Sequence, residues 1–161
     1  MTSLGKVNPE ELESVLARGV SEIISKEEFV RLLQSGRRLR LKMGFDPSRP
    51  DIHLGHVVGL RKLRQLQELG HHVILIVGDW TAQIGDPSGQ SATRTMLSHQ
   101  QVLENAQSYL RQFFKVVDES RAEVMYQSEW FGKFDLAKVI ELTGRFTVAQ
   151  FLQRADFAAR F

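Results

Sequence analysis

Two histidines fall within a short stretch that links a strand pattern to a helix pattern. The stretch runs from Gly44 to His56 and ends in the order His53, Leu54, Gly55, His56. Histidines three residues apart at a helix start lie on one side of the helix, so both rings can face one ligand. The backbone N–H groups and the positive end of the helix dipole favour an anion there, phosphate in particular. Because Gly55 has no Cβ, a flat or anionic group can approach the backbone closely.

A metal site and an ordinary turn are the alternatives for these histidines. The chain has no cysteine, and the helical zinc proteases carry histidines four residues apart with a glutamate between them, a pattern that this turn lacks. His71 and His72 could supply further ligands, but the sequence does not fix their distance from the turn. The residues alone leave open whether His53 and His56 act on a ligand or only form the turn.

The periodicity on either side of the turn predicts a β-α-β unit. Residues 39–45 alternate apolar and cationic side chains, residues 56–69 place apolar side chains at helical spacing, and residues 73–77 are an apolar run. The two strands should be parallel, with a right-handed connection. Ligands of such sheets bind beyond the carboxyl ends of the strands. Loops 44–56 and 78–94 both leave from those ends, so we expect them to face one crevice.

The second loop, residues 78–94, is long and rich in glycine, which is typical of functional loops. It contains the order Gly85-Asp86-Pro87-Ser88-Gly89. Ordinary type I turns have the same composition, so the sequence by itself leaves both interpretations open. The polar residues that follow include Gln90 and Arg94.

Two amphipathic helices are predicted before the β-α-β unit. The first has Asn8 as its N-cap and stops at Gly19. The second begins at Ser25 with a capping-box pattern and ends at Gly36. We expect both helices to pack against the domain without chemistry of their own.

After the second loop the sequence predicts more helices and a third strand. Ser98 should cap a helix of roughly twenty residues with one apolar face, and residues 124–126 read as a strand. Further helices should start at Asp135 and Thr147, and Asp156 should cap a final turn.

Length and composition indicate a soluble, intracellular protein. The 161 residues are enough for one domain or most of one. The formal net charge of +2 permits a nucleic-acid partner without arguing for one. The longest apolar run, residues 73–77, is too short to span a membrane, and the N-terminus lacks the features of a signal peptide. The lack of cysteine excludes disulfides and thiolate metal sites.

Three of these segments together resemble one enzyme family. Asp46–Ser48 followed by His53–His56 is similar to the signature of class I aminoacyl-tRNA synthetases. The Gly85–Gly89 segment and residues 147–152 add a resemblance to the bacterial tyrosyl-tRNA synthetases. The resemblance extends over residues 20–161, nearly the whole chain.

The resemblance implies a Rossmann-like α/β fold in which a parallel sheet with flanking helices follows two N-terminal helices. It divides the chain into a helical extension at residues 1–36 and the first half of a catalytic domain at residues 37–161. The implied activity is that of a tyrosine–tRNA ligase, which forms tyrosyl-adenylate from ATP and L-tyrosine and passes tyrosine to tRNA(Tyr). The family further implies a cytoplasmic homodimer, with Mg²⁺ arriving on ATP and no metal held by the protein.

The resemblance also implies roles for individual residues. The implied ATP-binding residues are Gly44, Phe45, Asp46, Pro47, Ser48, His53, Gly55 and His56. The implied catalytic residues are His53, His56 and Arg94, and the implied tyrosine-binding residues are Lys42, Thr81 and Asp86. Asp86 would receive the substrate ammonium, and Arg94 would hold pyrophosphate.

Some features depart from the family pattern. Lys42 stands where many bacterial members have tyrosine, and Gln90 replaces a loop lysine. The family's Lys-Met-Ser-Lys-Ser loop, its Tyr-x-x-x-Gln helix and its C-terminal tRNA-binding regions do not occur in the 161 residues. We therefore expect an incomplete catalytic domain that is nearly inactive alone.

Two other functions compete with this interpretation. Another nucleotidylyltransferase with a His-x-Gly-His turn would also bind ATP, but it would not explain the Gly85–Gly89 segment or residues 147–152. The second alternative is an inert nucleotide-binding fragment.

Overall fold

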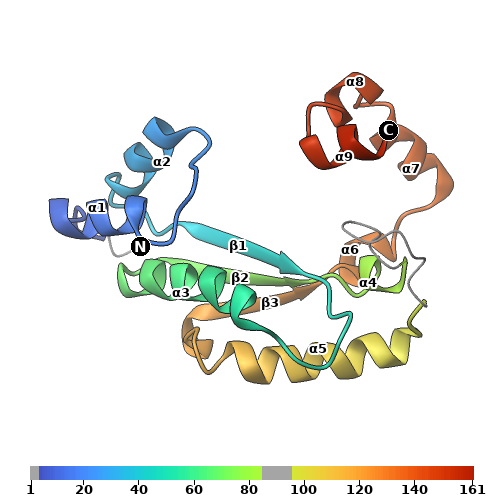
Figure 1. Ribbon diagram of the computed structural model, residues 1–161, viewed down its shortest axis with the longest axis horizontal. Helices are drawn as coiled ribbons and strands as arrows, with labels where there is room; N and C mark the ends of the chain where they lie inside the picture. The colour runs from blue at the N-terminus through green and yellow to red at the C-terminus, as the bar shows by residue number, and fades with distance from the viewer. Residues whose placement is uncertain (1–3, 85–95) are drawn as a thin grey trace.

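Three parallel strands form the centre of the computed structural model, which describes residues 4–84 and 96–161 (Figure 1). They are β1 (Arg40–Phe45), β2 (His72–Val77) and β3 (Ala122–Tyr126), in the order β1-β2-β3. Phe45 pairs with Val77, and Val77 pairs with Tyr126, so the three carboxyl ends are level at one edge. The parallel pairing of the two strands of the β-α-β unit is confirmed, and the strand expected at residues 124–126 joins the same sheet.

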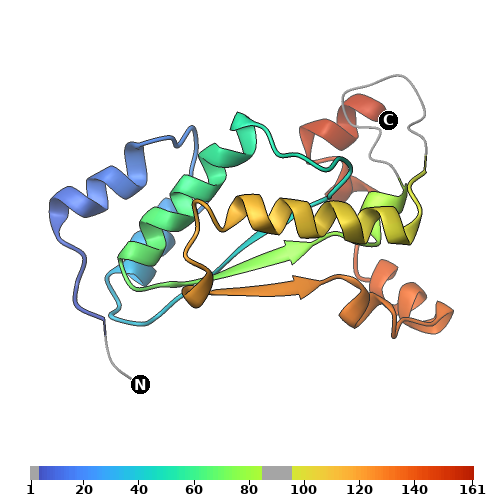
Figure 2. The ribbon, with the colours of Figure 1, turned by 90° about the horizontal axis from the view of Figure 1, so that it is seen from below.

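Helices α3 (Leu54–Glu68) and α5 (His99–Phe113) lie along the sheet (Figure 2). Alternate residues of β2 point toward them, as the two-residue period of a strand requires. The main core consists of Phe45, Leu60, Leu63, Val73, Leu75, Val77, Ala106, Tyr109, Phe113 and Val117. On β1, Arg40, Lys42 and Gly44 occupy the opposite face and are exposed.

Helix α5 begins where the sequence predicted but is shorter than expected. Ser98 caps it and forms a capping box with Gln101. The helix has 15 residues and ends at Phe113. The 3₁₀ turn η1 (Glu119–Arg121) then leads into β3.

Helices α1 (Pro9–Ala17) and α2 (Lys26–Leu33) pack near the amino ends of the strands (Figure 1). They share a second small core of Val15 and Leu33 with Leu66 of α3. The Asn8 cap is confirmed, since its side chain accepts the N–H of Glu11 at 2.8 Å. The capping box at Ser25 was wrong. Ser25 has a φ of 58°, in the left-handed region, and makes no side-chain cap hydrogen bond, because an N-cap side chain reaches the helix only from extended backbone.

Helices α6 (Ser128–Phe131), α7 (Leu136–Thr143), α8 (Val148–Phe151) and α9 (Ala155–Arg160) follow β3. Figure 1 shows that α7, α8 and α9 lie apart from the sheet. Asp135 and Thr147 cap α7 and α8 as predicted. Asp156 is not a cap, because α9 begins at Ala155 and Arg154 holds the N-cap position. In the part of the chain that the structure describes, no helix is long and apolar enough to cross a membrane.

Candidate active site

Loops from all three strands meet at the carboxyl edge of the sheet. The N–H of Gly78 donates to the carbonyl of Phe45 at 2.8 Å, and the N–H of Gln127 donates to that of Val77 at 3.0 Å. These bonds extend the strand pairing into the loops. A cavity of 330 Å³ opens at this edge. Its lining residues are Gly44, Phe45, Asp46, Ile76, Gly78 and Gln127.

Thr81, the first residue of α4 (Thr81–Ile84), joins the loops after β1, β2 and β3. Its hydroxyl lies 2.6 Å from Oδ1 of Asp46 and 3.0 Å from Oε1 of Gln127. Its backbone N–H also donates to that amide oxygen, at 3.2 Å. A Cβ at Gly78 would collide with the Asp46 carboxylate and the Thr81 hydroxyl, so glycine is required at this approach. The loops after β1 and β2 therefore meet as predicted over residues 78–84, whereas Asp86, Gln90 and Arg94 lie outside the described residues.

The histidine turn forms the N-terminal end of α3. The helix begins at Leu54, two residues earlier than the sequence pattern indicated, so His53 is the N-cap and His56 lies in the first turn. Nδ1 of His53 accepts the N–H of Gly55 at 3.1 Å. Nδ1 of His56 accepts the N–H of His53 at 3.3 Å. The two ring centroids are 4.1 Å apart, so the rings lie side by side as the spacing predicted.

These hydrogen bonds decide which nitrogen of each histidine carries the proton. A neutral imidazole has one donor and one acceptor nitrogen. Since Nδ1 accepts a backbone N–H in both rings, the proton of each neutral ring lies on Nε2. The turn thus presents two Nε2–H donors beside a helix N-terminus, which suits the oxygens of a phosphate group.

His56 is held by the aromatic core. Its ring centroid lies 5.6 Å from that of Tyr109 and 6.4 Å from that of Phe113, both buried side chains of α5. Burial, and then the proximity of His53, lower the pKa of His56 below its ordinary value. His56 is therefore neutral at neutral pH and can donate from Nε2 without carrying a charge.

The structure gives a reason for glycine at position 55 that the sequence did not reveal. A Cβ at this position would lie 2.9 Å from atoms of the His53 ring, so glycine allows that ring to fold back over the helix end. The N–H of Gly55 is already donated to His53. Of the backbone donors expected to bind phosphate, this one is engaged within the protein.

Two amides of α5 that the sequence analysis missed hold the turn between β1 and α3. Asn105 Nδ2 donates to the carbonyl of Pro47 at 3.1 Å. Gln112 Nε2 donates to the carbonyl of Pro50 at 3.1 Å, and its Oε1 accepts the N–H of Ile52 at 3.3 Å. Asn105 and Gln112 are about two helical turns apart and thus share one stripe of α5. Their spacing placed both beside the apolar stripe of α5, but no signal in the sequence linked them to this turn.

The remaining candidate residues differ in how far their side chains are buried. Phe45 and Pro47 are buried, so only their backbone can reach a ligand. Lys42 is exposed on the same face of β1 as Gly44. His71 and His72 are not further ligands of the site, because they lie at the opposite end of β2 from its carboxyl edge. Among the described residues, no group of histidine and carboxylate side chains could hold a metal ion.

Comparison with known proteins identifies the family of this chain. A sequence model described as "tRNA synthetases class I (W and Y)" matches residues 34–161, which include the histidine turn. The chain belongs to this family.

Relatives of known name agree with that membership. The chain is 64% identical over 151 residues to the tyrosine–tRNA ligase of Dehalococcoides mccartyi strain CBDB1 and 51% identical over 155 residues to that of Thermotoga maritima. These matches cover 94% and 96% of the chain. They cover only 38% and 39% of the two relatives, so the chain spans about two fifths of their length.

A solved structure confirms the fold expected from the resemblance. The tyrosyl-tRNA synthetase of Archaeoglobus fulgidus, in complex with L-tyrosine, superposes with a TM-score of 0.71 at 26% identity. The match covers 88% of this chain and 41% of that one. The Rossmann-like sheet of class I synthetases is therefore the fold of this chain, over part of the domain.

Proposed function

We propose that this chain supplies the ATP-binding turn of a tyrosine–tRNA ligase, which forms tyrosyl-adenylate and transfers tyrosine to tRNA(Tyr). The observation that carries the proposal is the pair of Nε2–H donors of His53 and His56 at the N-terminus of α3. The relatives that match nearly the whole chain bear this ligase name. ATP is a substrate here, and Mg²⁺ arrives with its phosphates.

The histidines act on charge that develops at the α-phosphate. An oxygen of the tyrosine carboxylate attacks the α-phosphorus, the bond to the bridging oxygen breaks, and pyrophosphate leaves with the electron pair. Such a transfer needs positioning and stabilisation of phosphate oxygens more than covalent help. Fixed donors provide this because they do not reorganise during the step. In the proposal His53 and His56 supply these donors, and residues 44–48 place the nucleotide.

The amino acid is proposed to bind beside Thr81. Asp46 and Gln127 hold Thr81 at the cavity edge through the hydrogen bonds described above. Lys42 is two residues before Gly44 on the same strand face, about 7 Å away along the chain, so its long side chain can reach the mouth of the cavity. Asp86 and Arg94 complete the proposal as partners of the substrate ammonium and of pyrophosphate.

The same proposal includes a homodimer in the cytoplasm. Helices α7 and α8 expose large apolar side chains, which supports a protein surface that another chain covers. Those exposed on these helices are Leu136, Val139, Ile140, Leu142, Val148 and Phe151.

Tyrosine-dependent exchange of pyrophosphate into ATP, measured on the full-length protein, tests the proposal. We expect exchange with tyrosine and at most a trace with phenylalanine or tryptophan. Removing one preorganised donor typically costs 10²–10³ in rate, so His56→Ala should lower the exchange by about that factor. Exchange that needs no amino acid would instead indicate another nucleotidylyltransferase.

A further inference from the structure

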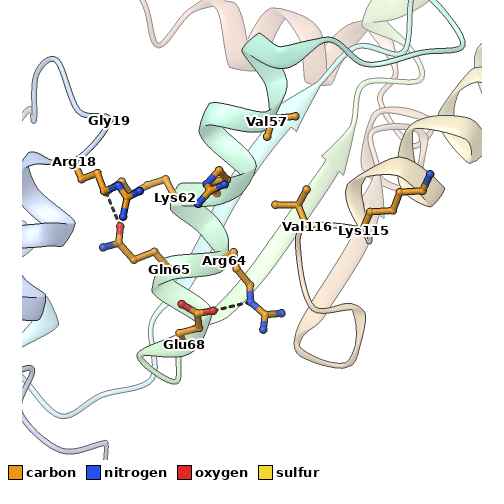
Figure 3. A pocket seen from close by; sticks show the side chains of 10 residues that line it. Arg18, Gly19, Val57, Lys62, Arg64, Gln65, Glu68, Lys115 and Val116 are labelled. Atoms are coloured by element: carbon orange, nitrogen blue, oxygen red, sulfur yellow. Dashed lines mark hydrogen bonds and ion pairs between the residues drawn. The ribbon is translucent and has the colours of Figure 1, made fainter.

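A second cavity, of 560 Å³, lies along the outer side of α3 between the end of α1 and the end of α5 (Figure 3). It is separate from the carboxyl edge of the sheet. The charged residues that line it are Arg18, Arg61, Lys62, Arg64, Lys115 and Glu68. Five of the six are cations, in a chain whose formal net charge is only +2. We call this surface the α3 groove.

The single carboxylate of the α3 groove does not balance these charges. Glu68 forms an ion pair with Arg64 at 3.0 Å, which leaves the other four cations without it. Lys62 Nζ donates to the carbonyl of Val15 at 2.8 Å and to Oε1 of Gln65 at 2.7 Å, both neutral acceptors. Burial and the nearby positive charge of Arg18 lower the pKa of Lys62. Like charges therefore lie close together in the groove, and a bound anion would reduce the repulsion between them.

The groove lies on the same helix as the histidine turn. Its lining begins at Val57, the residue after His56, and continues along α3 to Glu68. With a rise of 1.5 Å per residue, this distance is roughly 16 Å. One helix therefore carries the histidine donors at its end and a row of cations along its side. The cations of α3 lie between Arg61 and Arg64, and Arg18 and Lys115 flank them on neighbouring segments (Figure 3). The positive charge is thus spread over the width of the cavity, which suits several phosphates better than one compact anion.

We propose that the α3 groove binds successive phosphates of an RNA backbone. That the groove binds anions is inferred from the charges of its lining residues. The choice of RNA as their source rests on the proposed function, since a ligase acting on tRNA must hold an RNA beside its active site. Arg18, Arg61 and Lys115 are the exposed cations of the groove and contact the backbone, while Lys62 contributes its charge from a fixed position. Contacts of this kind depend on salt and not on base sequence.

The test measures the affinity of the protein for a fluorescent RNA hairpin at several salt concentrations. The Arg18→Ala/Arg61→Ala variant removes two exposed cations of the groove. Lys26→Ala/Arg37→Ala removes two exposed cations outside it and is the matched control. Each phosphate contact contributes about 0.9 to the slope of log K against log salt, so the groove variant should lose about 1.8. At about 0.1 M salt this corresponds to roughly 60-fold weaker binding. The control should change little.

The outcomes separate this proposal from the proposed function. Equal losses in the two variants would mean a general effect of net charge and would overturn the groove as a site. Inorganic triphosphate that binds the unmodified protein as tightly as the hairpin, and loses as much in the groove variant, would assign a small polyphosphate site and also overturn it. Pyrophosphate exchange should be unchanged in the groove variant. If exchange fails in the unmodified protein while the RNA result holds, the ligase assignment is wrong and the groove stands.

Discussion

The proposed function gives His53 two separable roles, and one pair of substitutions distinguishes them. As N-cap of α3 it satisfies one of the N–H groups that a helix start leaves without a partner, through the 3.1 Å bond from Gly55. In the proposed function it also offers Nε2–H to phosphate as a ligand. Replacing a cap by alanine costs about 1 kcal/mol of stability. Removing a preorganised donor costs about 3–4 kcal/mol of transition-state stabilisation, or roughly 10²–10³ in rate.

Asparagine at position 53 keeps the first role and removes the second, because it is a good N-cap but does not reach as far as imidazole Nε2. We expect His53→Ala to lose both stability and activity. His53→Asn should retain the stability within about 0.5 kcal/mol and still lose exchange by at least about 10²-fold. Urea unfolding and tyrosine-dependent pyrophosphate exchange measure the two effects. If His53→Asn were as active as the unmodified protein, the histidine would serve only as a cap and the phosphate argument would fail.

Three further predictions concern a glutamine of α5, a glutamine of α3, and the histidines His56 and His71. Gln112→Leu should release the turn before α3, and it should therefore weaken ATP binding and lower exchange by about tenfold. The control, Gln107→Leu, lies at an exposed position of the same helix and should change neither KM nor kcat. Gln67 is fully buried and pairs with three backbone groups of residues 118 and 121. Gln67→Leu should therefore cost about 3 kcal/mol in urea unfolding, and a loss below about 1 kcal/mol would contradict this. Burial lowers the pKa of His71 below 6.5, and burial together with His53 lowers that of His56. Below pH 6.5 the unfolded chain therefore binds more protons than the folded chain does. The free energy of unfolding should decrease as the pH falls through this range, by up to about 1.4 kcal/mol per pH unit for each histidine. His71→Gln should flatten this dependence of stability on pH.

The elements around the site were predictable because each carries a local signal. Periodicity revealed β1, α3 and β2, and side-chain caps located the starts of α5, α7 and α8. Ser25 failed because its capping box is defined by residue types, whereas the backbone of Ser25 is left-handed. Leu54 lies three residues before Val57 and fits the apolar spacing, but only the hydrogen bonds of the turn show that α3 begins there with His53 as its N-cap.

The candidate site was predictable where its residues are close in sequence. His53 and His56 are joined by hydrogen bonds within one turn. Gln112 and Gln127 reach the site from elements 60 and 46 residues away from the groups they bind, Ile52 and Thr81. A single sequence carries no sign of which distant amide will meet which backbone group. Spacing placed Gln112 beside the core stripe of α5 but gave no reason to look for the turn there.

Some side chains of the hydrophobic core also border the candidate active site. Phe113 packs against Phe45 with ring centroids 4.5 Å apart, and it also borders His56. Phe45 in turn ends β1, and its carbonyl accepts the N–H of Gly78 in the loop that holds Thr81. Because interiors are closely packed, a change of volume at Phe113 cannot be confined to the core. Such a change also moves the aromatic ring that lies 6.4 Å from the ring of His56. Large-to-small substitutions at Phe113 should therefore reduce exchange even under conditions where the variant remains folded, since the donor depends on the packing beneath it.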